Sequence, residues 1–167
     1  MYIAVAAGLL SLSSAQPDSP DLQCILDRIP SATRSALLDE AVAGASGPGN
    51  EALVAAAHAC RTQRGWDGDT LASFGMLAYT YITGEQSRGR MERSGVDPDL
   101  IVQWFDGQDR PTTTTMPVSE AVMDGLFSHL AASGISQATL EAQVTSIGAF
   151  WAALVMAERL DAGLPIE

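Results

Sequence analysis

Two cysteines, Cys24 and Cys60, are the residues best suited to covalent chemistry in this sequence. Their number is even, and the N-terminus, described below, predicts export to an oxidising compartment. We therefore expect one disulfide bond between them. No Cys-x-x-Cys motif is present, so the low-pKa attacking thiol of that redox motif is missing. The alternative is a pair of buried free thiols, as in many cytosolic proteins.

His58 and His129 are the other candidate metal ligands. Cys60 follows His58 by two residues, and side chains at that spacing diverge on a helix, so these two cannot share one metal ion. Two Asp-Gly segments, at 67–69 and 106–109, lack the glutamate that a calcium loop needs at its twelfth position. We therefore expect neither a metal site nor a cofactor.

Carboxylates are the remaining candidates for catalysis, because the nucleophile-elbow and phosphate-loop motifs are absent. All nine basic residues are arginines, which excludes a Schiff-base lysine. Glu120 and Asp124 lie four residues apart on one helix face; such a pair does acid–base chemistry when buried, but is more often a solvated face. The sequence therefore favours a non-catalytic protein. The alternative is a hydrolase of cell-envelope polymers with a catalytic carboxylate such as Glu120 or Glu85.

The charge balance excludes several partners. Twenty acidic residues outnumber nine basic ones, giving a formal net charge of −11 at pH 7. This field repels nucleic acids and anionic membrane surfaces, so we expect neither as a partner. The same carboxylates lose their charge on acidification, which leaves an acid-stress or chaperone-like protein as a second alternative. Apolar residues make up 47% of the chain and charged residues 17%, which is typical of a folded domain.

The N-terminus resembles a secretory signal. Residues 2–12 form an apolar run, and the small residues 13–15 follow it. This pattern is typical of a signal peptide and its cleavage site, although no Lys or Arg precedes the run; an ordinary core helix is the alternative. We expect a signal peptide at 1–15, a single domain at 16–167 and a periplasmic or secreted location in a bacterium.

Apolar residues recur at helical spacing along almost the whole chain, and no strand pattern of useful length occurs. The predicted helices cover residues 21–29, 31–44, 50–63, 70–88, 98–105, 117–133 and 136–162. Residues 106–116 carry no apolar stripe and are predicted to be a loop, whereas Asp97 and Pro98 form a clear helix start. The fold class is therefore all-α, a bundle of about six to seven helices.

The predicted C-terminal helix is long and very apolar. Five of its residues follow a 4-3-4-3 spacing that is typical of a coiled-coil seam: Leu140, Val144, Ile147, Trp151 and Leu154. Residues 147–157 are nearly all apolar or small, which indicates a central helix or one shared with a second copy in a homodimer. Eleven such residues are too few for a stable membrane span.

A candidate binding surface combines an arginine cluster with two aromatic residues. Arg88, Arg90 and Arg93 form the one local positive patch, and Trp104 and Phe105 precede the predicted loop. Arginines near a helix end also stabilise the helix dipole, and most aromatic side chains pack in cores. The leading hypothesis is an exported, non-catalytic helical protein that binds a protein partner or a small apolar ligand.

Overall fold

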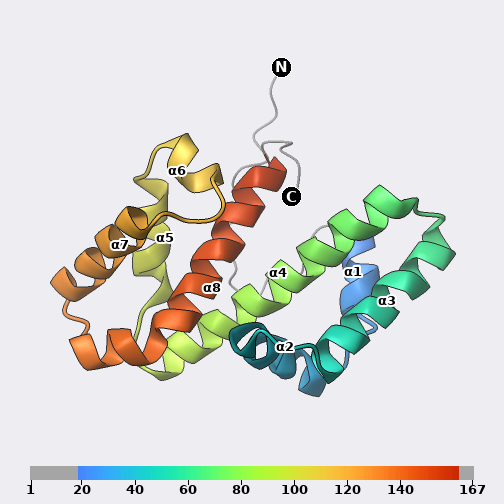
Figure 1. Cartoon of the computed structure of the whole chain (residues 1–167), viewed down its shortest axis with the longest axis horizontal. Coiled ribbons are helices and arrows are strands. Elements are labelled where there is room, and N and C mark those ends of the chain that lie inside the picture. The colour runs from blue at the N-terminus through green and yellow to red at the C-terminus, as the bar shows by residue number, and fades with distance from the viewer. Residues whose placement is uncertain (1–18, 162–167) are drawn as a thin grey trace. The chain divides into compact units, whose positions relative to one another are not determined.

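The computed structural model describes residues 19–161, with the side chains of residues 160 and 161 excepted; the predicted signal peptide at 1–15 lies outside this range. The described chain is all-α, as predicted, and contains no strand (Figure 1). Its eight helices are α1 Pro20–Leu26, α2 Ser31–Ala43, α3 Pro48–Arg64, α4 Gly68–Arg93, α5 Pro98–Asp106, α6 Arg110–Thr114, α7 Glu120–Ala132 and α8 Gln137–Asp161.

The described chain divides into two compact units by its internal packing, and the single domain predicted at 16–167 stays a prediction. The first unit runs to Thr83 and the second begins at Gly84, so the boundary lies inside α4. Helices α1, α2 and α3 and the first part of α4 belong to the first unit. The last part of α4 and helices α5 to α8 belong to the second.

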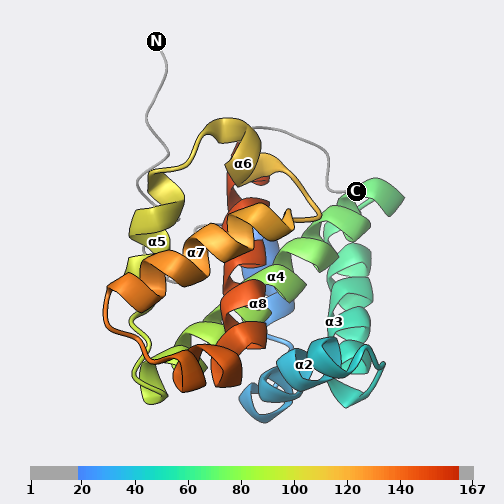
Figure 2. The ribbon, with the colours of Figure 1, turned by 60° about the vertical axis from the view of Figure 1, so that its left-hand side comes forward.

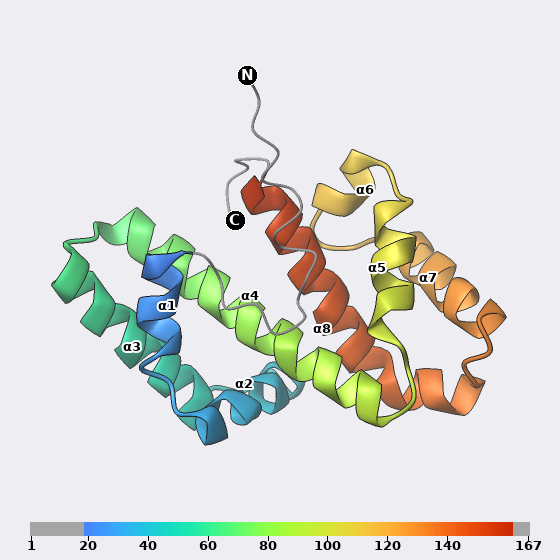
Figure 3. The same cartoon turned by 180° about the vertical axis from the view of Figure 1, so that it is seen from behind.

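In the first unit, α1 and α2 both pack against α3 (Figure 3). Its core consists of buried aliphatic side chains and the two cysteines: Leu22, Cys24, Ile25, Leu26, Ile29, Leu37, Leu53, Ala56, Ala57, Cys60, Ala78 and Ile82. The sulfur atoms of Cys24 and Cys60 lie 2.14 Å apart, at disulfide-bonding distance, with Cα atoms separated by 6.0 Å. This link joins α1 to α3 in the middle of that core.

In the second unit, α5 and α7 pack on α8, and α6 lies beside the C-terminal part of α8 (Figure 2). Trp151 is fully buried at the centre of this unit. Phe105 meets it edge-on, with ring centroids 4.8 Å apart, and Trp104 lies at 5.3 Å. Arg159 on α8 donates a hydrogen bond of 2.7 Å to the carbonyl of Thr114, which ties the end of α6 to α8.

Side-chain caps explain where several helices begin. Asp97, predicted as a cap, accepts a hydrogen bond of 3.0 Å from the backbone N–H of Asp99. Ser119 accepts one from Val122, so α7 starts at Glu120 and not at Pro117 as the sequence suggested. Asp109 caps α6 in the same way, which produces a short helix inside the segment predicted to be a loop.

Helix α4 is continuous through Gly84. The glycine has a packing role there, because a Cβ at this position would lie 2.8 Å from the Cβ of Ala153 on α8. Glycine therefore permits a close approach of the two helices within the second unit.

In the described chain, one helix is long and apolar enough to cross a membrane by length and composition: the segment Gln137–Arg159 of α8. The sequence argument against a span counted only residues 147–157, whereas the whole helix is longer. Half of its most apolar 18-residue stretch is buried inside the fold, as in the core helix of a soluble protein. Length and composition thus fit both environments, and the burial is what a core helix needs.

Candidate functional site

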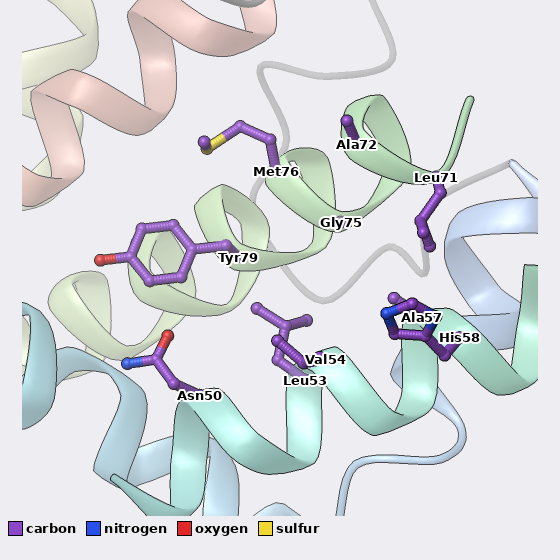
Figure 4. A pocket seen from close by; sticks show the side chains of 10 residues that line it. All are labelled: Asn50, Leu53, Val54, Ala57, His58, Leu71, Ala72, Gly75, Met76 and Tyr79. Carbon is purple, nitrogen blue, oxygen red and sulfur yellow. The ribbon is translucent and has the colours of Figure 1, made fainter. Parts of the chain in front are cut away.

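An apolar groove lies between α3 and α4 of the first unit, with a volume of about 400 Å³ (Figure 4). We call it the α3–α4 groove. It is lined by Asn50, Leu53, Val54, Ala57, His58, Leu71, Ala72, Gly75, Met76 and Tyr79. Each helix contributes five residues at spacings of one, three or four positions, which places them on one helix face. The groove is therefore a direct product of two facing helical stripes.

Small residues leave room between these stripes, and apolar residues line it. Gly75 has no heavy atom within 4 Å of the position that a Cβ would take, apart from its own helix and chain neighbours. Leu53 and Ala57 are buried beneath the groove, whereas Val54 and Met76 are 56% and 44% exposed. Two large apolar side chains thus face solvent next to an open space.

A short turn fixes the start of α4 relative to α3. Gly65 ends α3 in the left-handed region, with φ of 73°. Asp67 accepts a hydrogen bond of 2.8 Å from the backbone N–H of Thr70 in the first turn of α4. The rings of Trp66 and Phe74 stack at 5.0 Å beside this turn. These contacts hold the two walls of the groove at their connected end.

Asn50 and Tyr79 are the polar residues at one end of the groove (Figure 4). The Asn50 side chain donates to the Oε2 atom of Glu40 at 3.0 Å and to the carbonyl of Ala45 at 3.5 Å. Glu40 lies on α2 and also accepts the backbone N–H groups of Gly49 and Asn50, at 2.7 and 2.9 Å. A carboxylate of α2 therefore caps α3 next to the groove.

Two pKa shifts mark this end of the groove. Burial raises the pKa of Tyr79 above its ordinary value, and the negative charge of Glu40 raises it further, so the phenol stays protonated. For Glu40, burial by itself raises the pKa, but the hydrogen bonds from Gly49, Asn50 and Gly47 outweigh it and the pKa is lowered. The site thus holds an ionised carboxylate beside a neutral phenol.

His58 and Leu71 lie at the opposite end of the groove (Figure 4). His58 is exposed and is the one titratable lining residue besides Tyr79. Among the residues that the structure describes, no three Cys, His, Asp or Glu side chains gather in a way that would hold a metal ion. The groove has a mostly apolar lining with a few polar groups, a composition that small-molecule sites share.

The structure places the predicted aromatic pair against the core of the second unit. Phe105 is 4% exposed and packs on Trp151, so it is a core residue and not part of a surface. Trp104 is half-buried and also contacts Trp151. A Cβ on Gly125 would lie 3.0 Å from the Trp104 ring, so α7 closes over this indole.

The predicted arginine cluster has structural contacts. Arg88 pairs with Glu92 at 3.1 Å and with Asp99 at 2.8 Å, which joins the end of α4 to the start of α5. Arg90 is half-buried with a partner, and Arg93 is exposed in the last turn. Partner binding at this cluster stays a prediction.

The predicted self-association seam faces inward along most of its length. Leu140, Ile147, Trp151 and Leu154 are all buried, at 0 to 3% exposure, and Val144 alone is 49% exposed. The regular spacing of the seam is explained by packing inside the second unit. The carboxylate pair considered for catalysis, Glu120 and Asp124, is exposed on α7.

The sequence analysis did not predict the groove, although Val54 belongs to the apolar stripe of α3. The helical stripe of α3 was visible, but whether a given flank of the stripe is covered depends on the position of α4. The signal was Gly75 next to Met76, a glycine and a flexible apolar side chain within an otherwise regular stripe. Small residues in such a stripe leave space that a neighbouring helix does not fill.

No protein-family model, curated protein or solved structure matches this chain.

Proposed function

We propose that the protein is a non-catalytic binding protein and that the α3–α4 groove takes one small apolar ligand. The observation that carries the proposal is the groove itself, with Val54 and Met76 exposed beside it. Its volume of about 400 Å³ falls within the usual range of small-molecule sites, about 300–1,000 Å³. Covering Val54 and Met76 with a ligand removes apolar surface from water, which supplies the driving force.

Binding of the neutral apolar fluorophore N-phenylnaphthylamine tests this function. We expect its fluorescence to rise on binding to the wild-type protein, because an apolar groove excludes water from the dye. Gly75→Leu fills the groove and Val54→Gln places an amide in it, so both variants should bind the dye more weakly. Val42→Gln is the matched control, because Val42 is 49% exposed on α2 and does not line the groove.

The result that rejects the proposal is equal binding by all four proteins. Wild type, Gly75→Leu, Val54→Gln and Val42→Gln would then take the dye at some other surface. Circular dichroism of each variant confirms that the helices are intact. Because Val54 is an exposed side chain, a loss of binding in Val54→Gln without a loss of helicity assigns the dye to the groove.

We also propose that the protein is exported, with cleavage after Ala15 and a periplasmic or secreted location. The support is the Cys24–Cys60 pair at disulfide distance, a bond that oxidising compartments favour. Mass spectrometry of the protein from its own host, without reductant, reads both features. A mature chain that begins at Gln16 and lacks two hydrogens supports export, whereas an uncut chain with free thiols rejects it.

A further inference from the structure

The polar end of the α3–α4 groove offers hydrogen-bond acceptors, and this property selects a class of ligand. The Asn50 amide is oriented by two oxygen atoms: Nδ2 faces Glu40 Oε2 and the carbonyl of Ala45. A flipped amide would place Oδ1 against both oxygens, so chemistry fixes the orientation. Within the described chain Oδ1 accepts no hydrogen bond, so it is left for a ligand.

The positive end of α3 is already neutralised. A helix N-terminus with free N–H groups attracts anions. Here the Glu40 carboxylate occupies the N–H groups of Gly49 and Asn50, at 2.7 and 2.9 Å. An incoming anion would therefore meet a carboxylate in place of free donors.

Tyr79 completes this end of the groove with a phenol that remains protonated and can donate or accept. A ligand group placed here meets the Asn50 Oδ1, the Tyr79 hydroxyl and, behind Asn50, the ionised Glu40. The protein also carries a net charge of −11. A hydrogen-bond donor, above all a cationic one, is stabilised by these groups, and a carboxylate is repelled.

We propose that the ligand of the α3–α4 groove is a cationic or neutral amphiphile, an alkyl amine or alcohol in chemical class, whose polar end contacts Asn50 and Tyr79. Its hydrocarbon part lies along Val54, Gly75 and Met76. This inference rests on the proposed function and adds the end-group selectivity. The groove binds a fatty acid more weakly than an alkyl amine or alcohol of the same chain length.

Displacement of N-phenylnaphthylamine by decylamine, decanol and decanoate tests the selectivity, because the three compounds share a chain and differ in the end group. We expect decylamine to displace the dye at a concentration about tenfold below that of decanoate, with decanol between them. Glu40→Gln should reduce the difference between the concentrations of decylamine and decanoate that displace the dye. Asp124→Asn removes the same formal charge from an exposed position outside the groove and should leave this difference unchanged.

Tyr79→Phe keeps the Glu40 cap and removes one hydroxyl, so it serves if Glu40→Gln fails to fold. We expect it to weaken decylamine and decanol by about threefold to tenfold. Failure of all three compounds to displace the dye would reject the amphiphile as the ligand, whereas the dye binding of the Gly75 and Val54 variants decides the proposed function. Equal displacement by all three would reject the selectivity and leave the groove as a binding site. Preference for decanoate that disappears in His58→Gln would place the polar end at the opposite side and overturn the inference.

Discussion

Gly84 on α4 lies against Ala153 on α8 so closely that a Cβ on the glycine would be 2.8 Å from the alanine Cβ. Real Cβ atoms do not approach to that distance, so any larger residue forces one helix to shift. By contrast, Gly75 on the same helix faces open space. One helix thus holds a glycine that packing requires and a glycine that packing does not.

Alanine substitution of these two glycines should have opposite effects on stability. Gly84→Ala introduces a steric clash, and we expect it to lower the free energy of unfolding by about 1–3 kcal/mol. Gly75→Ala adds a better helix former without a clash, and we expect a gain of about 0.5–1 kcal/mol. Urea unfolding of both variants and wild type measures the two changes. A stabilising Gly84→Ala would contradict the close approach.

Removing the Cys24–Cys60 link should destabilise the first unit. The cysteines are 36 residues apart in sequence, and chain-entropy arguments give about 4 kcal/mol for closing a loop of that length. We expect reductant to shift the urea midpoint of the wild-type protein downward. The double variant Cys24→Ala/Cys60→Ala is the control, because reductant should not move its midpoint. Identical wild-type curves with and without reductant would contradict a disulfide in this protein.

The Glu40 cap should make stability depend on pH. The pKa of Glu40 in the folded protein is lowered from its ordinary value of 4.5, because hydrogen bonds to Gly49, Asn50 and Gly47 outweigh the opposing effect of burial. A lowered pKa means that the stabilisation is complete above pH 4.5 and is lost as the pH falls through the folded value. We expect Glu40→Gln to be less stable than wild type near neutral pH, with the difference shrinking under acidic conditions. Thermal unfolding of both proteins from neutral to acidic pH measures this stability difference. A difference that grows on acidification would contradict the prediction.

Phe105 should behave as a core residue. It is 4% exposed and packs on Trp151, so Phe105→Ala leaves a cavity, and we expect a loss of about 3–5 kcal/mol in the free energy of unfolding. Gln103→Ala, at an exposed position of the same helix, should change stability by less than about 0.5 kcal/mol. Chemical denaturation of both variants distinguishes a core position from a surface one.

Helix type and order were predictable because apolar periodicity and local caps are local properties. Asp97 before Pro98 marked the start of α5, and the 4-3-4-3 pattern from Leu140 to Leu154 marked the core side of α8. The short α6 was missed because it has five residues and no apolar stripe, although Asp109 caps it and Pro111 lies in its first turn.

The candidate site was not predictable in the same way, because it depends on which apolar side chains the neighbouring helices leave exposed. Val54 and Leu53 are adjacent in sequence and equally apolar, yet one is 56% exposed and the other 7%. The difference comes from the position of α4, which no pattern within α3 contains. Likewise, the hydrogen bond from Asn50 to Glu40 joins α3 to α2 across a loop. The proposed preference for a cationic ligand depends on that contact.

Because the boundary between the compact units falls between Thr83 and Gly84, inside α4, neither unit corresponds to a separable fragment of the chain. A fragment that ended at residue 83 would strip the carbonyl groups of the preceding turn of their N–H donors, as any cut helix end does. A truncated protein that keeps α4 whole would extend to Val96, because the N–H groups of residues 94–96 donate to carbonyls of the last turn of α4. An inserted sequence at that boundary would likewise interrupt α4, so the boundary that core packing alone suggests is not a place to divide the chain.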